Sequence, residues 1–317
     1  PFVLVVDALP GFLGHATLRV LLEEGKRVAD NAFAPEDPFV LDEIAKAHGG
    51  TAIVDIGVAP GMSNAILGHV RTRWQRVDRF ECLVGGLPVE RTWPFEYKAP
   101  FSPVDVLEEY TRPARYVERG RLVVRPALTD IQRHEVEGIG TLESFNTDGL
   151  RTLLRFDDVA MMKEKTLRYP GHARLMEAIR EAGLLDEEPR LVKGEMVVPR
   201  DVTAAALEDA WFLAPHDPEL TVMWIIVQGV DEGDNPIEQV WRLLDRGDPA
   251  RGVSSMARTT GYPCSAAVHL LADGGVTGTG IVAPEDLAAE ADAFAFLLAH
   301  QAERGVDYRV ETRGPQR

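Results

Sequence analysis

Arginine and histidine occur together in the segment KTLRYPGH at 165–172, and both side chains can act on a small polar ligand. Arg168 precedes a predicted helix start near Gly171, and its planar guanidinium could hold a carboxylate through two parallel hydrogen bonds. His172 lies at the start of that helix, and the near-neutral pKa of histidine suits a base or a proton relay. The alternatives are a surface ion pair for Arg168 and a helix-capping role for His172.

A second group of candidate residues lies in a long segment, 86–103, whose prolines predict a loop. Loops of this length are usually functional or disordered, and the run WPFEYK is atypical of a disordered linker. Lys98 is one of only six lysines in the chain, and desolvation among aromatic side chains would let it act as a base. A solvated loop lysine is the alternative. Glu96 and Tyr97 beside it are candidate ligand contacts.

Further hydrogen-bonding side chains occur in FNTDGL at 145–150 and next to Arg168. Asn146 and Asp148 fit an Asx turn and could bond a ligand amine, although Asx turns need no ligand. Tyr169 could supply a hydroxyl hydrogen bond or lie at the edge of the core. The eight histidines show no HxH or HxxxH spacing and no cysteine partner, so we predict no metal site.

The elements that position these residues are organised around the stretch TAIVDIGVAPGMSN at 51–64. It predicts a buried strand that ends at Asp55, a tight turn from Gly57 through Pro60 to Gly61, and a helix that Ser63 caps. Such a turn lies at the carboxyl end of a strand, where open α/β sheets bind ligands. An ordinary strand-to-helix turn without a ligand is the alternative.

The rest of the chain divides at about residue 75 into two patterns. Residues 1–75 alternate strand and helix, with strands at 2–6 and 28–30 and helices at 11–24 and 37–48, which predicts a parallel sheet. Residues 76–317 contain strands of alternating polarity, which favour a mainly antiparallel sheet. We predict these strands at 78–85, 116–124, 133–145, 221–230 and 238–244, with Ser102 capping the helix after the loop.

These motifs resemble the saccharopine dehydrogenase-like family, especially its lysine 6-dehydrogenase branch. The matching blocks run in order through most of the chain: VVDALPGFLG, VDIGVAPGMSN, VGGLP, TDGLRTL, KTLRYPGH, ARTTGYPCSAAVHLL and GIVAPEDL. The resemblance implies an incomplete Rossmann-like sheet at 1–75, which is the C-terminal half of a dinucleotide-binding domain. It also implies a substrate-binding and oligomerisation domain at 76–317, and a helix at 254–272 that packs back on the first sheet.

By resemblance, the cofactor is NAD or NADP and the substrate is an amino acid. The implied cofactor-facing positions are Leu9, Pro10, Gly57, Val58, Pro60, Gly61 and Met62, with Asp55 in a catalytic position. The implied substrate-facing positions are Glu96, Tyr97, Lys98, Asn146, Asp148, Arg168, Tyr169 and His172. Lys98 or His172 would take the ammonium proton before hydride leaves the carbon that bears the amine.

The usual opening of a dinucleotide-binding fold, a strand followed by GxGxxG, does not occur before the first strand of this sequence. GGVTGTG at 274–280 is followed by Pro284 and predicts a hairpin or loop instead of that turn. We therefore predict lysine 6-dehydrogenase-like oxidative deamination, with a saccharopine dehydrogenase or reductase as the alternative. A truncated, non-catalytic binding or assembly subunit is the second alternative.

The composition of the chain limits the classes of molecule that it is expected to bind. A net charge of −16 argues against nucleic acid and anionic membranes, and no apolar run is long enough to span a bilayer. Cys82 and Cys264 form no disulfide framework, which fits a reducing cytoplasm. Apolar strands such as 222–227 predict a sheet face that a second copy covers, so we expect a homodimer or a higher homo-oligomer.

Overall fold

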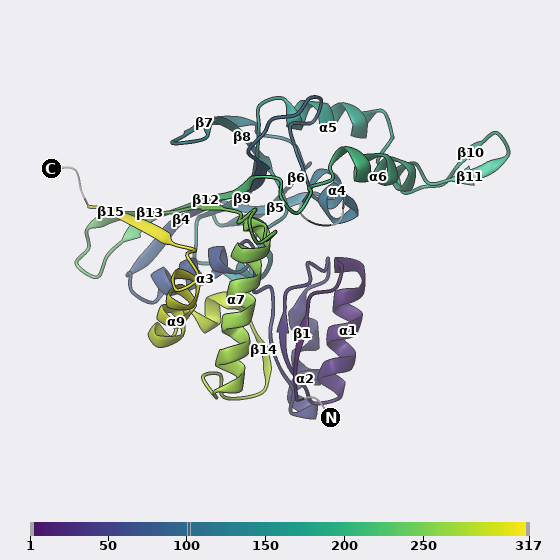
Figure 1. The fold of residues 1–317 in the computed structure, drawn as a ribbon. Helices are drawn as coiled ribbons and strands as arrows, with labels where there is room; N and C mark the ends of the chain where they lie inside the picture. The colour runs from purple at the N-terminus through teal and green to yellow at the C-terminus, as the bar shows by residue number, and fades with distance from the viewer. Residues whose placement is uncertain (1–2, 100, 102, 315–317) are drawn as a thin grey trace.

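The computed structural model describes residues 3–99, 101 and 103–314, and it contains two main sheets (Figure 1). The smaller sheet is entirely parallel, in the order β1-β2-β3-β14. Its strands are β1 (Leu4–Asp7), β2 (Arg27–Asp30), β3 (Thr51–Ile53) and β14 (Gly280–Val282). Its connections carry α1 (Gly11–Glu23), the 3-10 helix η1 (Pro38–Leu41) and α2 (Asp42–His48). Buried aliphatic residues such as Leu18, Leu22 and Val28 pack between these helices and the strands.

The larger sheet has nine strands and is antiparallel except where β4 pairs with β9. Its order is β15-β13-β12-β4-β9-β5-β6, and β8 also pairs with β9 and carries β7 on its other side. The strands are β4 (Arg76–Pro88), β5 (Ala114–Glu118), β6 (Arg121–Arg125), β7 (Gln132–Val136), β8 (Gly140–Asn146), β9 (Met161–Arg168), β12 (Glu219–Val230), β13 (Pro236–Arg246) and β15 (Tyr308–Arg313).

Helices connect the two sheets into one structure. α7 (Ser255–Ala272) runs between them and contacts β1 and β2 as well as β12 and β13 (Figure 1). α3 (Met62–Arg71) packs against β4, α8 (Pro284–Leu287) and α9 (Ala291–Ala302). The other helices are α4 (Pro103–Thr111), the 3-10 helix η2 (Arg151–Arg155), α5 (His172–Glu181) and α6 (Pro199–Ala210). A small hairpin of β10 (Arg190–Val192) and β11 (Glu195–Val197) projects beyond α6 (Figure 1).

The predicted fold class is confirmed: a parallel sheet is followed by a mainly antiparallel one. Two predicted strands were wrong, because 116–124 and 133–145 each form a hairpin. The first hairpin turns at Arg119 and Gly120, whose φ angles of 52° and 70° suit a tight two-residue turn. The second turns between Val136 and Gly140.

Two further expectations need correction. Ser63 is not the helix cap, since α3 begins at Met62 after Gly61, and the Ser63 hydroxyl bonds Asn64 instead. The loop predicted from Gly86 begins later, because β4 continues to Pro88. The glycine-rich run at 274–280 is a loop, as predicted, and it leads into β14, which completes the parallel sheet. The predicted cap at position 102 lies outside the described residues.

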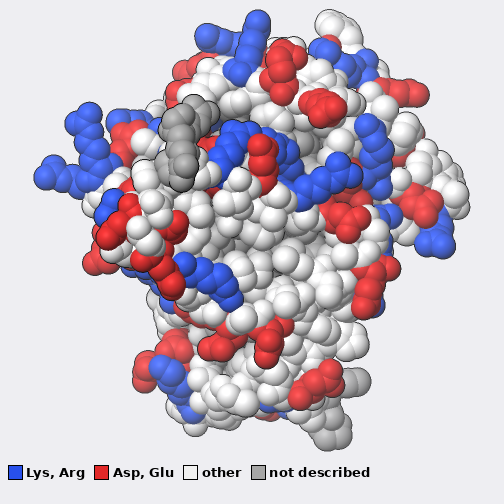
Figure 2. All heavy atoms as spheres, turned by 90° about the vertical axis from the view of Figure 1, so that its left-hand side faces the viewer, with Lys and Arg blue, Asp and Glu red and all other residues white. Residues whose placement is uncertain are grey.

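Charged side chains of both signs are interspersed over the face that Figure 2 shows, and a broad band across its middle carries few of them. The excess of negative charge in the sequence therefore does not form a continuous acidic field on this face. Within the described residues, every helix is too short or too polar to cross a bilayer.

Candidate active site

A cavity of about 570 Å³ lies where the carboxyl ends of the parallel strands meet the larger sheet and α4. This volume falls within the range of roughly 300 to 1,000 Å³ that is usual for small-molecule sites. Its parallel-sheet wall is formed by residues 8–11, 31–33, Asp55 and 57–60. The opposite wall comes from 84–86 of β4, from 147–149 and from β9, and α4 and the first turns of α7 close the sides.

The turn after β3 forms much of the parallel-sheet wall of the cavity. Gly57 accepts a hydrogen bond from Met62 N at 2.9 Å and donates one to the Pro60 carbonyl at 3.1 Å. A Cβ atom on Gly61 would lie 2.0 Å from the Gly57 oxygen, and the φ angle of Gly61 is 130°. Only glycine fits there. Of the predicted cofactor positions, Leu9, Pro10, Gly57, Val58 and Pro60 line the cavity, while Gly61 and Met62 hold the turn behind it.

The turn is held from the other side by η2. Arg151 donates through Nε and Nη2 to the Asp55 carboxylate at 3.1 to 3.3 Å, and both side chains are buried. Asn64 donates to the Thr152 hydroxyl at 3.1 Å, and Thr152 donates to Glu285 at 3.0 Å. Burial raises the pKa of Glu285 to about 7. Two motifs almost a hundred residues apart thus form one buried polar cluster.

Arg168 lines the far end of the cavity from β9 and is buried. Its Nη2 donates to Glu109 of α4 at 2.7 Å, its Nη1 donates to the Leu167 carbonyl, and its guanidinium lies 4.5 Å from the Tyr97 ring centre. Burial opposes its charge, but nearby Tyr110 and Glu109 keep the pKa of Arg168 above its ordinary value. The predicted substrate-binding residues Arg168 and Tyr97 therefore lie together, and Glu109 already occupies one of the guanidinium's bonds.

His172 is not at the cavity wall. Its Nδ1 is 2.9 Å from the Phe95 carbonyl and its Nε2 is 2.9 Å from the Tyr110 hydroxyl. Burial, with a contribution from Arg168, lowers the pKa of His172 to about 3. A histidine that is neutral and bonded at both nitrogens supports the loop at 95 and α4. This geometry gives no support to His172 as the base.

The other loop candidates also lie away from the cavity lining. Lys98 is half-buried but does not border the cavity. Glu96 accepts a hydrogen bond from Arg91 at 2.7 Å. The Tyr169 hydroxyl donates to the Pro88 carbonyl at 2.9 Å, which ties the end of β9 to the end of β4. Of this loop, Tyr97 alone among the predicted residues reaches the cavity.

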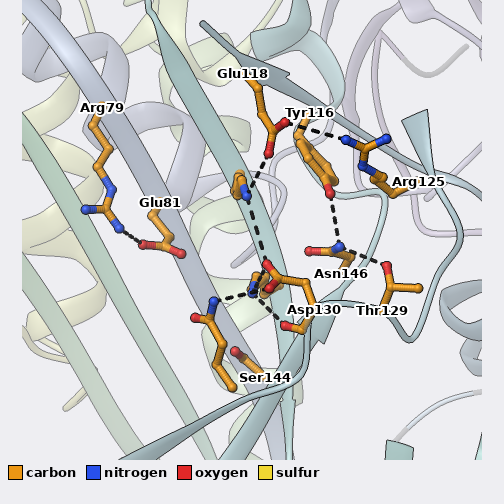
Figure 3. A network of polar contacts seen from close by, with 12 residues as sticks. Arg79, Glu81, Tyr116, Glu118, Arg125, Thr129, Asp130, Ser144 and Asn146 are labelled. Carbon is orange, nitrogen blue, oxygen red and sulfur yellow. Dashed lines mark hydrogen bonds and ion pairs between the residues drawn. The ribbon is translucent and has the colours of Figure 1, made fainter. Parts of the chain in front are cut away.

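Asn146 and Asp148 lie two residues apart at the end of β8, but only Asp148 borders the cavity. Asp148 lines the cavity and is paired with Arg115, whose Nε and Nη2 lie 2.8 to 3.2 Å from its carboxylate oxygens. Asn146 does not line the cavity and donates to the Tyr116 and Thr129 hydroxyls, each at 3.0 Å (Figure 3). Asn146 therefore supports the sheet, and Asp148 remains a candidate for ligand contact.

Glu164 of β9 is a cavity residue that we did not predict. It is 5% exposed, and its Oε2 has no hydrogen-bond partner in the described part of the chain. Strand alternation was the available signal, because Glu164 and Arg168 share one face of β9 while Lys165 faces the other way. Lys165 bonds Asp130 in the network on that other face (Figure 3).

The parallel-sheet side of the cavity is a crevice at strand ends, where open α/β sheets bind ligands. A nicotinamide ring bound there would face the glycine turn and the apolar Leu9, Pro10 and Val58 beside it. Residues 31 and 33 close the crevice, and Asn31 Oδ1 would lie 2.9 Å from a Cβ atom at Gly57. In the described residues, no group of three or more histidine, cysteine or acidic side chains is arranged to hold a metal ion.

Comparisons with known proteins agree with this geometry. The model of the saccharopine dehydrogenase C-terminal domain matches residues 57–306. The chain is 21% identical over 369 aligned residues to the saccharopine dehydrogenase [NADP(+), L-glutamate-forming] of Schizosaccharomyces pombe, covering 90% of this chain and 79% of that protein. It is 23% identical over 203 residues to the α-aminoadipic semialdehyde synthase of Arabidopsis thaliana, covering 59% and 19%.

Solved structures share the fold. The apo saccharopine dehydrogenase (L-Glu forming) of Saccharomyces cerevisiae superposes with a TM-score of 0.76 at 17% identity, covering 98% of this chain and 85% of that one. The homospermidine synthase of Legionella pneumophila, in complex with NAD, gives a TM-score of 0.60 at 11% identity, covering 98% and 76%.

The fold and cavity thus define an amino-acid dehydrogenase-like oxidoreductase. The match over most of the chain shows that it belongs to the saccharopine dehydrogenase family. The lysine 6-dehydrogenase assignment within that family stays a proposal, because these relatives are named for saccharopine and aminoadipic semialdehyde.

Proposed function

We propose that this protein oxidises the amine-bearing carbon of an amino acid with NAD or NADP, most simply L-lysine at its terminal amine. The observation that carries the proposal is the cavity itself, which places the glycine turn on one wall and Arg168 on the opposite wall. The cofactor, when bound, accepts hydride from the carbon, and the imine that results is hydrolysed to the semialdehyde.

The protein's own residues would hold and orient the substrate. Arg168, with Tyr97 against its guanidinium, offers the carboxylate of an amino acid a buried cation. A substrate carboxylate would share that cation with Glu109, so Glu109 sets the strength of the contact. The apolar crevice near Leu9, Pro10 and Val58 would exclude water from the reacting carbon.

Saccharopine is the second candidate substrate, supported by the names of the relatives from Schizosaccharomyces pombe and Saccharomyces cerevisiae. Both substrates carry a carboxylate and an amine several bonds apart, so the same two walls serve either. A saccharopine enzyme must in addition accommodate a second amino-acid moiety on the nitrogen.

A steady-state assay separates these candidates. Formation of NADH or NADPH is followed at 340 nm with L-lysine, saccharopine and L-norleucine, each with NAD⁺ and with NADP⁺. Turnover of lysine but not of norleucine, which lacks the terminal amine, is the expected result. Turnover of saccharopine alone would move the protein to the second candidate, and no turnover of either would contradict the proposal.

We also propose a homo-oligomer that forms through the larger sheet. β15 is an edge strand of this sheet, and Leu244 and Val310 on β13 and β15 are 44% and 47% exposed. The sparsely charged band in Figure 2 is consistent with a surface that a second copy covers. Sedimentation at micromolar concentration is expected to show at least a dimer, and a monomer alone would contradict it.

A further inference from the structure

Two carboxylates of the cavity wall, Asp105 of α4 and Glu164 of β9, lack a cation in the described residues, and Glu164 is the buried one. Glu164 of β9 has no ion-pair partner within 4 Å in the described residues, and its Oε2 accepts no hydrogen bond. Its Oε1 lies against Gly149, because a Cβ atom built on Gly149 would be 1.6 Å from that oxygen. A buried carboxylate without a partner destabilises a fold, so its presence in a cavity indicates a functional group.

Other carboxylates of the cavity wall are neutralised by arginines. Asp55 pairs with Arg151 at 3.1 Å, Asp148 with Arg115 at 2.8 Å and Glu109 with Arg168 at 2.7 Å. Glu108 pairs with Arg112 at 3.3 Å and also with Arg200. These pairs show that the fold supplies a cation to an acidic side chain at this cavity in four cases. Of the two carboxylates that remain, Asp105 is only half-buried, whereas Glu164 is buried and is left for a cation from the ligand.

The surroundings of Glu164 favour its neutral form when the cavity is empty. Burial, and then the negative charges of Asp148, Glu109 and Asp55, raise the pKa of Glu164 to about 8. All three of these neighbours line the same cavity as Glu164. At neutral pH most molecules therefore carry a proton on Glu164, and a bound cation would displace that proton to solvent.

The position of Glu164 on β9 distinguishes which amine can reach it. Glu164 and Arg168 share one face of the strand four residues apart, which separates their Cα atoms by roughly 13 Å at 3.3 Å per residue. An α-amine is adjacent to its own carboxylate, whereas a terminal amine lies several carbons away. A carboxylate held at Arg168 therefore leaves the terminal amine, not the α-amine, within reach of Glu164.

We propose that Glu164 is the catalytic residue that receives the reacting amine: its carboxylate binds the ammonium group and then takes one of the ammonium protons. The proposal rests on the function proposed above. The proton passes from nitrogen to the carboxylate oxygen, which leaves a neutral amine and a neutral carboxylic acid. The lone pair on nitrogen is then free to expel hydride from the adjacent carbon. On this assignment Glu164 replaces Lys98 and His172 as the base.

The test measures protons, not turnover. Binding of L-lysine is followed by isothermal titration calorimetry at pH 7 with saturating NADH, so that no reaction occurs, in phosphate and in Tris. The difference in apparent enthalpy between the two buffers gives the number of protons released. A carboxyl with a pKa of about 8 that ionises fully on binding releases about 0.9 proton per lysine.

Matched variants and ligands make the result specific. Glu164→Gln should bind lysine with no proton release, whereas Glu23→Gln, which removes an exposed carboxylate of α1 paired with Arg19, should release as many protons as the parent. L-norleucine, without the terminal amine, should release none from the parent. Saccharopine is titrated in the same way in case lysine does not bind.

The outcomes separate the two proposals. Failure of both lysine and saccharopine to bind the parent would overturn the proposed function and this inference with it. Binding without proton release, equal release from Glu164→Gln, or equal release with norleucine would overturn the assignment of Glu164 alone.

A thermal melt confirms that Glu164→Gln folds, and its pH dependence gives a second test of the raised pKa of Glu164. In the parent, the pKa of Glu164 is higher in the folded state than in the unfolded chain. The contribution of Glu164 to stability is therefore complete below about pH 4.5 and is lost as the pH rises to about 8. The melting temperature of the parent should therefore fall relative to that of Glu164→Gln across this window. A pH-independent difference would contradict the raised pKa.

Discussion

Arg151 donates hydrogen bonds through Nε and Nη2 to both carboxylate oxygens of Asp55, at 3.1 to 3.3 Å and across 96 residues of sequence. Both residues have a positive φ, 52° for Arg151 and 51° for Asp55. Positive φ is uncommon for residues other than glycine, and it persists where the surrounding structure enforces it. This pair fixes the end of β3 and, with it, the turn that borders the cavity.

Arg151→Met is expected to lower the free energy of unfolding by about 3 to 5 kcal/mol, because it leaves the Asp55 carboxylate buried without a cation. Urea unfolding at pH 7 measures this. The control is Arg19→Met, which removes an exposed pair with Glu23 and should cost about 0 to 1 kcal/mol. Adding Asp55→Asn to Arg151→Met should restore part of the loss. Equal losses for the two arginines would contradict the structural role of the pair.

Gly61→Ala tests the turn itself. The new methyl group would lie 2.0 Å from the Gly57 oxygen, at a φ of 130°, so the turn cannot form unchanged. We expect a loss of more than about 3 kcal/mol and a marked loss of NADH binding. Gly120→Ala is the matched control, since its φ is 70° and no atom lies within 4 Å of the added carbon. It should lose about 1 to 2 kcal/mol and bind NADH normally. Similar behaviour of the two variants would refute the close-approach argument.

The sequence was informative about local structure and much less about which distant segments meet. Hydrophobic runs and turn residues predicted β1, β2, β3 and α1, because those signals are local, but they did not predict β14. The motifs at 51–64 and 147–153 were both visible. Nothing in a single sequence shows that Arg151 reaches Asp55 or that Thr152 reaches Asn64. Both contacts depend on how the chain of the larger sheet folds back onto the turn after β3.

The same contrast between local signals and distant contacts applies to the candidate site. Arg168 and Tyr97 were predicted from residue type, and they do lie together at the cavity. Lys98 and His172 were chosen for their chemistry, yet burial and hydrogen bonding, which a sequence does not reveal, separate them from the cavity. Glu164 could have been found from the period-two pattern of its strand, which places it on the face of Arg168 and opposite Lys165.

His172→Phe should destabilise the protein by about 1 to 3 kcal/mol at pH 7, because the Tyr110 hydroxyl and the Phe95 carbonyl lose a buried partner. The folded pKa of His172 is lowered to about 3, so the unfolded chain binds the proton more tightly. The contribution of His172 to stability is therefore present above about pH 6.5 and is lost as pH falls toward 3.

The stability gap between the parent and His172→Phe should consequently narrow by up to about 2 kcal/mol between pH 7 and pH 5. Chemical denaturation at both pH values measures it. The pH profile of turnover should keep its shape in the variant. A gap that widens at low pH would show that His172 is protonated in the folded state, and a displaced turnover profile would return it to the list of candidate bases.

Arg168→Lys tests the substrate end of the cavity. Lysine keeps the positive charge but lacks the planar fork, so its single ammonium group cannot bind a substrate carboxylate while it also bonds Glu109 and the Leu167 carbonyl, as the guanidinium can. A charge-assisted contact of this kind contributes roughly 1.5 to 3 kcal/mol. We therefore expect kcat/KM for the amino acid to fall by about ten- to a hundredfold, with the affinity for NADH nearly unchanged.

Arg174→Lys on α5 is the control for this substitution, because the Arg174 side chain is 76% exposed and, within the described residues, forms an ion pair only with Glu177. It should leave both kinetic constants at the parent level. A diamine of similar length without a carboxylate separates the two ends of the cavity: its kcat/KM should be the same in the parent and in Arg168→Lys. If the amino acid and the diamine lose equally, Arg168 acts by supporting β9 and α4, and another group must bind the carboxylate.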